Sequence, residues 1–304
     1  MTDYITDIKP AEHKSKGLGA FLIFSLIIAA MITLRFLIVL FFVKPDTGFY
    51  DISETFRIPF MGTLVRSFDY FAAILVFAAV VAQIVFVKKR RPVIPARGTG
   101  TLIFTSSLTA FLLLASAVIY LLDAVSVILL SSSVSLSSYI SNGRFEFILF
   151  ICAIPAAIYF FKIASENPQR RSVSSRSLNL FLACFPIIIA YARLFSCFFN
   201  MDARLNSSGH IYELMCQVAI MMYFMTEALM FSGRKVSVSL YSYAFIAVLL
   251  ISLSSFVNLI LSAFWLLSVS EPPLMYAIDC AFALYILSRI YSQIKYGKTP
   301  NAAI

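Results

Sequence analysis

Charged side chains are scarce in this chain. Aspartate, glutamate, lysine and arginine make up 13% of its 304 residues, about half their share in a typical soluble domain. Hydrophobic residues make up 61% of the chain, and the mean hydropathy is +0.90. This composition excludes an ordinary soluble globular domain and predicts a protein that uses lipid as its solvent.

Histidine and cysteine are also few. The two histidines, His13 and His210, lie far apart in the sequence, which excludes a metal site built on paired histidines. The five cysteines are an odd number, all fall in apolar segments, and form no C-x-x-C motif, which argues against a disulfide framework and a metal site. We therefore expect no metal and no cofactor.

Known catalytic motifs are missing as well. The sequence contains no G-x-S-x-G, no Walker A motif and no H-E-x-x-H. We therefore assign no catalytic residues, and favour a protein that is not an enzyme. An intramembrane enzyme that works through aspartate or glutamate alone stays open as the least supported alternative.

Long apolar runs are what the sequence has in abundance. A helix needs about 20 mostly apolar residues to cross a hydrocarbon core of about 30 Å. Eight windows meet this length, at 18–43, 66–87, 101–130, 146–163, 178–199, 211–231, 240–268 and 273–292. Because an unpaired backbone group in lipid costs several kcal/mol, each window should be a helix. We predict an all-α, polytopic membrane protein with eight transmembrane helices.

The basic residues predict the orientation of these helices. Loops rich in lysine and arginine stay in the cytoplasm. If both termini are cytoplasmic, seventeen basic residues fall on the cytoplasmic side, Arg289 among them, and five on the outer side. The basic run "KKRRPVIPAR" that follows the second window is then a stop-transfer signal facing anionic lipid, so we expect the lipid bilayer and not nucleic acid as its partner.

The two halves of the chain resemble each other. Arg35 in the first window corresponds to Arg193 in the fifth, because each precedes a pair of phenylalanines by five or six residues. An acid then opens the next window in both halves, Asp69 in the first and Glu213 in the second. We predict a tandem 4+4 repeat, with halves at 1–165 and 166–304 that share one orientation in the membrane.

Polar side chains inside the windows define the candidate site. Residues seven apart return to nearly the same face of a helix, so the polar residues of a window form stripes that should face protein or water. In the fifth window such a stripe holds Asn179, Pro186, Arg193 and Asn200. Seven groups collect in the outer leaflet and form the predicted ligand-binding set. They are Arg35, Asp69, Asp123, Arg193, Glu213, Asn258 and Asp279.

We expect these groups to line a polar chamber that opens to the outside. Arg35 is predicted to pair with Asp69 or Asp279, and Arg193 with Glu213 or Asp123. The alternative is that these charges are structural salt bridges that fix the register of the helices. Serine and threonine in the windows are expected mostly to bond carbonyls of their own or a neighbouring helix.

Two functions follow from these features. The first is a transporter or permease-like protein that binds a small polar or anionic solute through Arg35 and Arg193. The second is a non-transporting membrane subunit, such as a sensor, scaffold or assembly factor, which acts through a membrane protein partner. Short loops and a mass of 34.0 kDa favour a multi-pass protein of the bacterial cytoplasmic membrane.

Overall fold

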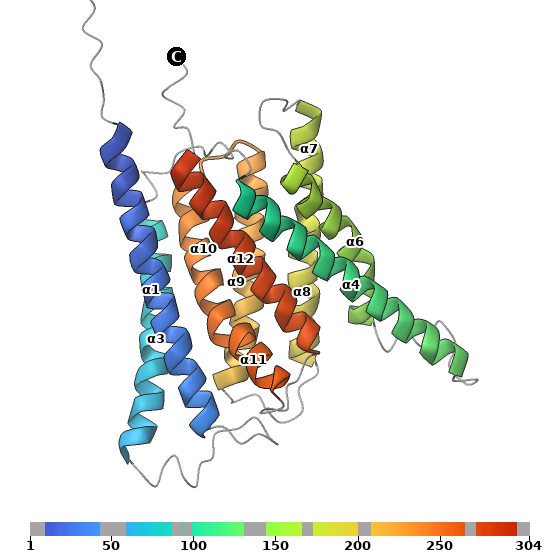
Figure 1. The fold of residues 1–304 in the computed structure, drawn as a ribbon, viewed down its shortest axis with the longest axis horizontal. Helices are drawn as coiled ribbons and strands as arrows, with labels where there is room; N and C mark the ends of the chain where they lie inside the picture. Colours follow the sequence, from blue (N-terminus) through green and yellow to red (C-terminus); the bar gives the residue numbers. More distant parts are fainter. Residues whose placement is uncertain are drawn as a thin grey trace, which may run out of the picture.

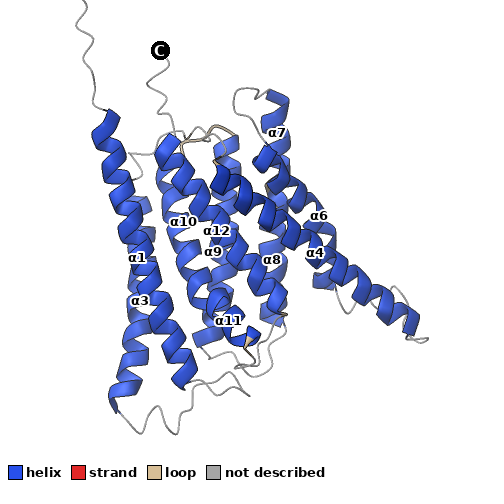
Figure 2. Cartoon of the chain, in the orientation of Figure 1, coloured by secondary structure: helices blue, strands red, loops and turns tan. Residues whose placement is uncertain are grey.

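The computed structural model describes eight stretches of the chain. They are residues 10–42, 59–86, 93, 99–130, 144–165, 173–199, 208–264 and 272–296. The regular elements of these stretches are helices (Figure 2). Eight helices are long and apolar enough to cross a membrane, which confirms the eight predicted spans and the all-α fold.

Six of the spans are single helices. Their bounds are α1 Pro10–Phe42, α3 Pro59–Val85, α4 Gly100–Leu130, α6 Arg144–Ser165, α9 Ser208–Phe231 and α12 Pro273–Tyr296. Each coincides with one of the apolar windows, because a backbone in hydrocarbon must satisfy its hydrogen bonds within the segment.

The fifth and seventh spans are interrupted. The fifth consists of α7 (Val173–Leu182) and α8 (Cys184–Phe199). Pro186 lies three residues after the break at Ala183, and a proline removes the hydrogen bond to the carbonyl four residues earlier, here that of Leu182. The seventh consists of α10 (Ser237–Ile251), a π-helical turn (Ser252–Phe256) and α11 (Val257–Ala263).

Six spans form a ring. Each helix packs against the next one in the order α4, α6, α8, α9, α10, α12. Helix α12 closes the ring by packing against α4. Helices α1 and α3 lie outside this ring, beside α10 and α12 (Figure 1). The ring, and not the whole set of eight helices, therefore encloses most of the interior.

Both described ends of the chain lie at the same end of the bundle (Figure 1). We call this the termini end; it holds the start of α1 and the C-terminal ends of α3, α6, α9 and α12. The opposite end holds the C-terminal ends of α1, α4, α8 and α11. These two names fix depth within the bundle without assigning either end to the cytoplasm.

The two halves of the chain occupy different places in the bundle. The predicted repeat makes α1 and α3 the counterparts of α8 and α9, yet α8 and α9 belong to the ring and α1 and α3 do not. In addition, α4 packs against α12 and α3 against α10, so the segments 1–165 and 166–304 interlock. The 4+4 repeat is not confirmed by this arrangement.

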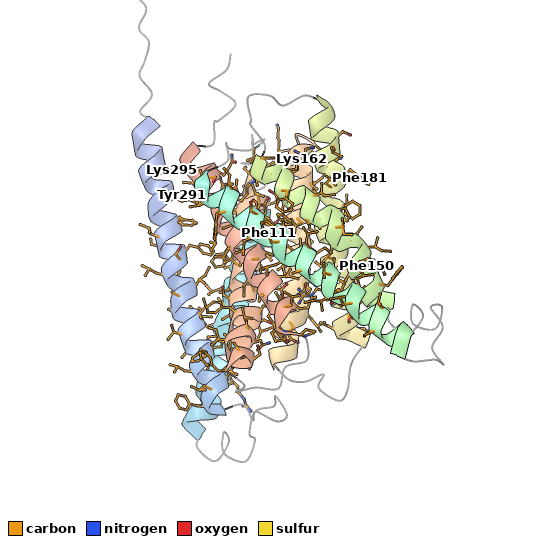
Figure 3. The ribbon with its side chains drawn as sticks, turned by 45° about the vertical axis from the view of Figure 1, so that its right-hand side comes forward. Phe111, Phe150, Lys162, Phe181, Tyr291 and Lys295 are labelled. Carbon is orange, nitrogen blue, oxygen red and sulfur yellow. The ribbon has the colours of Figure 1, made fainter. Side chains whose placement is uncertain are left out.

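The surface around the bundle is apolar, and its interior is rich in aromatic residues. Phe111 and Phe181 point outward from α4 and α7 (Figure 3), as expected of side chains that face lipid. Lys162 and Lys295 lie toward the termini end of the same view. The largest fully buried side chains include Tyr159, Tyr223, Tyr276, Tyr285, Phe160, Phe224 and Phe282.

Candidate functional site

A buried ion pair lies inside the ring. Arg193 of α8 and Asp279 of α12 are 2% and 0% exposed. Nη1 of Arg193 contacts Oδ1 of Asp279, and Nη2 donates to Oδ2 at 3.1 Å. This two-point arrangement is the strongest that a guanidinium makes with a carboxylate. The pairing offsets the desolvation cost of placing either charge within the membrane.

Two neutral side chains complete the surroundings of Asp279. Ser255 Oγ donates to Oδ2 at 2.7 Å, and Gln217 Nε2 donates to the same oxygen at 3.2 Å. Oδ2 thus accepts three hydrogen bonds, from α8, α9 and the π-helical turn. Gln217 Oε1 is buried and has no hydrogen-bond partner among the described residues. We refer to Arg193, Gln217, Ser255 and Asp279 as the Asp279 cluster.

The interruptions in the fifth and seventh spans lie close to this cluster. Arg193 follows the Pro186 break by two turns of α8, and Ser255 is part of the π-helical turn. A π-helical turn adds one residue to a helical turn and changes the direction in which the following side chains point, and such turns occur frequently at functional sites. Here the turn directs Ser255 toward Asp279 and, one turn later, Asn258 toward Glu213.

The partner of Arg193 differs from the predicted one. We expected Glu213 or Asp123, but the carboxylate that Arg193 binds in two places is that of Asp279, which we had named beside Asp69 as a partner of Arg35. Helical spacing gives the face on which a residue lies but not which helix packs against that face. Arg193 is buried and paired with an acid, as predicted, and the acid that it contacts in two places is neither of the two that we named for it.

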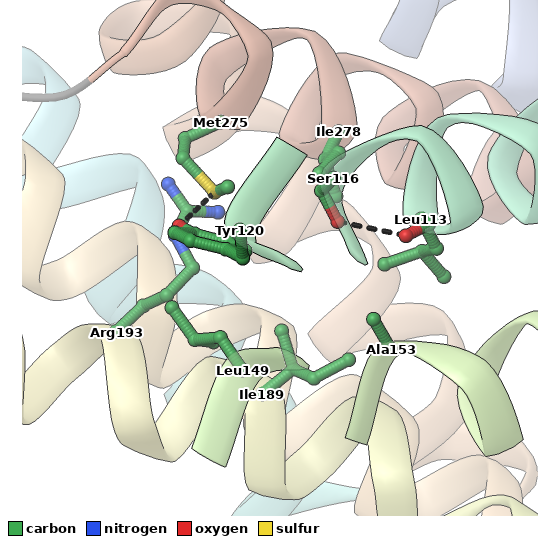
Figure 4. A pocket seen from close by; sticks show the side chains of 9 residues that line it. All are labelled: Leu113, Ser116, Tyr120, Leu149, Ala153, Ile189, Arg193, Met275 and Ile278. Atoms are coloured by element: carbon green, nitrogen blue, oxygen red, sulfur yellow. Dashed lines mark hydrogen bonds between the residues drawn. The ribbon is translucent and has the colours of Figure 1, made fainter. Parts of the chain in front are cut away.

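A small pocket adjoins the Asp279 cluster (Figure 4). It is lined by Arg193 and by side chains of α4, α6, α8 and α12, among them Ser116, Tyr120 and Ile278. The volume of the pocket is about 10 Å³, which is room for roughly one water molecule. In this conformation the pocket is therefore too narrow for a solute, and Arg193 is its charged wall.

Glu213 lies in a second polar group nearer the opposite end. Asn258 Nδ2 donates to Glu213 Oε1 at 2.9 Å, and Tyr276 donates its hydroxyl to the same oxygen at 3.0 Å. Asp279 follows Tyr276 by three residues on α12, so this group and the Asp279 cluster are about one helical turn apart. The structure thus brings Glu213, Asn258, Arg193 and Asp279 of the predicted set into one region.

Arg35 and Asp69 are linked through a tyrosine. The guanidinium of Arg35, on α1, lies 4.8 Å from the ring centre of Tyr212, on α9. The hydroxyl of Tyr212 donates to Asp69 Oδ1, on α3, at 2.8 Å. A cation over an aromatic face is attracted by the ring's quadrupole. Tyr212 therefore connects the two peripheral helices to the ring, a role that the sequence did not suggest.

Other polar residues of the windows behave as structural groups. Thr105 and Thr109 donate to the carbonyls four residues earlier in α4, at 3.0 and 2.8 Å, and Thr109 also reaches the carbonyl of Ala281 at 3.3 Å. Such bonds hold α4 against α12. Asp123 belongs to α4, but its side chain lies outside the described part of the structure.

A second buried ion pair lies toward the termini end, and the sequence reasoning missed it. Glu227 of α9 is 0% exposed and Arg289 of α12 is 3% exposed. Arg289 Nε donates to Glu227 Oε1 at 3.0 Å, and Tyr285 donates to the same oxygen at 2.7 Å. We had counted Arg289 as a basic residue of the cytoplasmic side, although it lies seven residues before the end of α12.

An aromatic layer separates the two ion pairs. Phe160, Phe224 and Phe282 come from α6, α9 and α12, and their ring centres lie 5.2 to 5.8 Å apart. On α12, Phe282 falls between Asp279 and Arg289, which are ten residues or about 15 Å apart along the helix. The two ion pairs are therefore separated along α12 by an apolar layer, which we call the partition.

The chain offers few ligands for a metal. The five cysteines form no disulfide, and no group of three or more His, Cys, Asp or Glu among the described residues could hold a metal ion. Comparisons of the chain with known protein families, with curated proteins and with solved structures found no match. The two ion pairs and the partition between them are therefore the features of the molecule that bear on its function.

Proposed function

We propose that this membrane protein is a transporter or permease-like protein that binds a small anionic solute at Arg193. The observation that carries the proposal is the buried Arg193–Asp279 pair beside a pocket. A guanidinium held in a low-dielectric interior is a strong site for a carboxylate or phosphate, because it forms two parallel hydrogen bonds to either. In the resting state Asp279 occupies that position.

Binding then requires Asp279 to release Arg193. An anionic solute competes with the Asp279 carboxylate for the same guanidinium. A proton that binds to Asp279 removes its negative charge and leaves Arg193 open to the solute. Gln217 presents its Nε2 to Asp279 Oδ2, and when its amide turns over, its Oε1 accepts the new carboxyl hydrogen. Binding of the anion is thereby coupled to uptake of a proton.

The closed interior supports a second reading, a non-transporting subunit. The pocket has room for about one water molecule, and both buried arginines of the ring are paired with carboxylates. In that reading the ion pairs fix the packing of the ring, and the protein acts through a membrane protein partner. The two readings differ in whether water ever reaches Arg193 from both ends of the bundle.

Cysteine accessibility separates the two readings. On a background without the five native cysteines, Ser116→Cys and Ile278→Cys place thiols in the pocket wall. Transport predicts that an impermeant thiol reagent labels them from each end, in intact cells and in inverted vesicles. It also predicts that small carboxylates or inorganic phosphate slow the labelling. Ser106→Cys, fully buried on α4 and ten residues from Ser116, is the matched control.

The outcomes are distinct. Labelling of both pocket thiols from both ends, with Ser106→Cys protected, supports alternating access to Arg193. Labelling from one end only, with no effect of any tested anion, contradicts transport and supports the subunit reading. Protection of both pocket thiols from both ends means that the ion pair is structural.

Orientation and membrane belong to the same proposal. The excess of basic residues in the terminal segments and the even-numbered loops of the sequence supports cytoplasmic N- and C-termini and a location in a bacterial cytoplasmic membrane. In that orientation the Asp279 cluster lies in the outer half of the bilayer. The tandem 4+4 repeat stays a hypothesis about ancestry, supported by the matching of Arg35 with Arg193 and of Asp69 with Glu213.

A further inference from the structure

The second ion pair is incompletely satisfied. Both donors that reach Glu227, Arg289 Nε and the hydroxyl of Tyr285, bond Oε1. Oε2 is buried and has no hydrogen-bond partner among the described residues. A carboxylate oxygen that is buried without a partner is costly, because it has lost its water and gained nothing in return. The Asp279 carboxylate differs, since both of its oxygens are bound.

The groups that face Glu227 come from three helices. Arg289 and Tyr285 belong to α12, Tyr159 to α6, and Tyr223 to α9 itself. Tyr223 lies four residues before Glu227, on the same face of the helix, and its hydroxyl is also buried without a hydrogen-bond partner among the described residues. The two residues that carry these unused oxygens, a carboxylate and a phenol, are therefore one helical turn apart on α9.

We propose that Glu227 is a proton-binding site, in which Oε2 takes up the proton. One proton adds to Oε2, the carboxylate becomes a neutral carboxyl group, and the charge of the pair rises by one while Arg289 stays charged. Oε1 keeps its bonds from Arg289 and Tyr285, so protonation does not require the pair to separate.

The position of the site determines where the proton comes from. Glu227 lies four residues from the end of α9, about 6 Å along the helix, and the exposed turn Ser232–Lys235 follows. Beyond Arg289, the hydroxyl groups of Ser292 and Thr99 are hydrogen-bonded to each other at 2.7 Å. This contact extends the polar region toward the termini end. On the other side the layer of Phe160, Phe224 and Phe282 excludes water. Glu227 therefore exchanges its proton with the termini end.

Infrared difference spectroscopy tests this site without a transported solute. The full-length protein in lipid is taken from neutral to acidic pH, and the carbonyl band of a protonated carboxyl group is followed. We expect a band that appears as the pH falls, shifts in deuterium oxide, and is lost in Glu227→Gln. The matched control is Glu213→Gln, a half-buried glutamate on the same helix fourteen residues away, in which the band should remain. Asp279→Asn is a second control: it removes any carboxyl band that comes from the proposed anion site, and the Glu227 band should remain in it.

Two results would overturn the site. One is that Glu227→Gln removes no part of the pH-dependent carboxyl band, so that its difference spectrum coincides with that of the wild type. The other is the lack of any such band in the wild type over the pH range in which its amide band shows intact helix. If Glu227→Gln fails to fold, Glu227→Asp replaces it, and the proposal then requires the band to shift in frequency or midpoint. This result is independent of anion binding at Arg193, so failure here and failure of the transport proposal are distinguishable.

Discussion

Removing one partner of the Arg193–Asp279 pair should destabilise the protein by an amount that depends on which partner is lost. Loss of one member of a buried pair costs about 3–5 kcal/mol, because the other charge is left uncompensated. In Arg193→Met, Asp279 keeps its bonds from Ser255 and Gln217, so we expect about 3 kcal/mol, the lower end of that range. In Asp279→Leu, all three donors lose their acceptor, so we expect about 5 kcal/mol.

The double variant Arg193→Met/Asp279→Leu gives the decisive comparison. A buried pair replaced by apolar residues of similar volume is often as stable as the pair or more so. Here Ser255 and Gln217 still lose their acceptor, which costs about 1 kcal/mol each. The double variant should therefore be at least about 3 kcal/mol more stable than the sum of the single changes predicts.

The free energy of unfolding is measured in mixed micelles as the fraction of sodium dodecyl sulfate is raised, with helix content followed by circular dichroism. Arg193→Lys is a control, because it keeps the charge and loses the two-point contact, and it should fall between the wild type and Arg193→Met. If the double change costs the sum of the single changes to within about 0.5 kcal/mol, the two side chains do not interact and the reasoning fails.

Three further changes test other parts of the interior. Phe282→Ala should lower the free energy of unfolding by about 3–5 kcal/mol. By opening the partition, it should also speed the collapse of a pH gradient in proteoliposomes. Phe104→Ala is the control, because Phe104 faces outward, and it should have neither effect. Tyr212→Phe should cost about 1 kcal/mol through the lost bond to Asp69, and Tyr212→Leu should cost more because Arg35 also loses the ring. Ser255→Ala should cost about 1.5–3 kcal/mol by unfolding titration, whereas the neighbouring Ser254→Ala, whose hydroxyl has no partner among the described residues, should be nearly neutral.

The spans could be predicted from the sequence because hydrophobicity over a window is a local property. The sixth window, 211–231, matches the observed span, and the other windows agree to within a few residues at most ends. Burial of Arg35, Arg193 and Asp279 also followed, because a charge in a window has to face protein or water.

Which residues meet could not be predicted in the same way. The pairing of Arg193 with Asp279 depends on how α8 and α12 are placed in the ring, and helical spacing within one window carries no information on that order. The π-helical turn at Ser252–Phe256 had no recognisable signal in its sequence, "SLSSF". Arg289 was missed for a different reason: its place near the end of the eighth window made it resemble a loop residue, whereas α12 continues for seven residues beyond it.

The two ion pairs are difficult to explain as packing devices alone. Each places two charges in an interior where apolar residues of similar volume would be as stable or more so. One pair adjoins a pocket, and the other leaves a carboxylate oxygen without a partner among the described residues. A purely structural pair has no use for either feature, while exchange of an anion needs a space and uptake of a proton needs an unused bonding group. On the two proposals above, each pair exchanges with its own end of the bundle, and the aromatic layer between the pairs keeps the two steps apart.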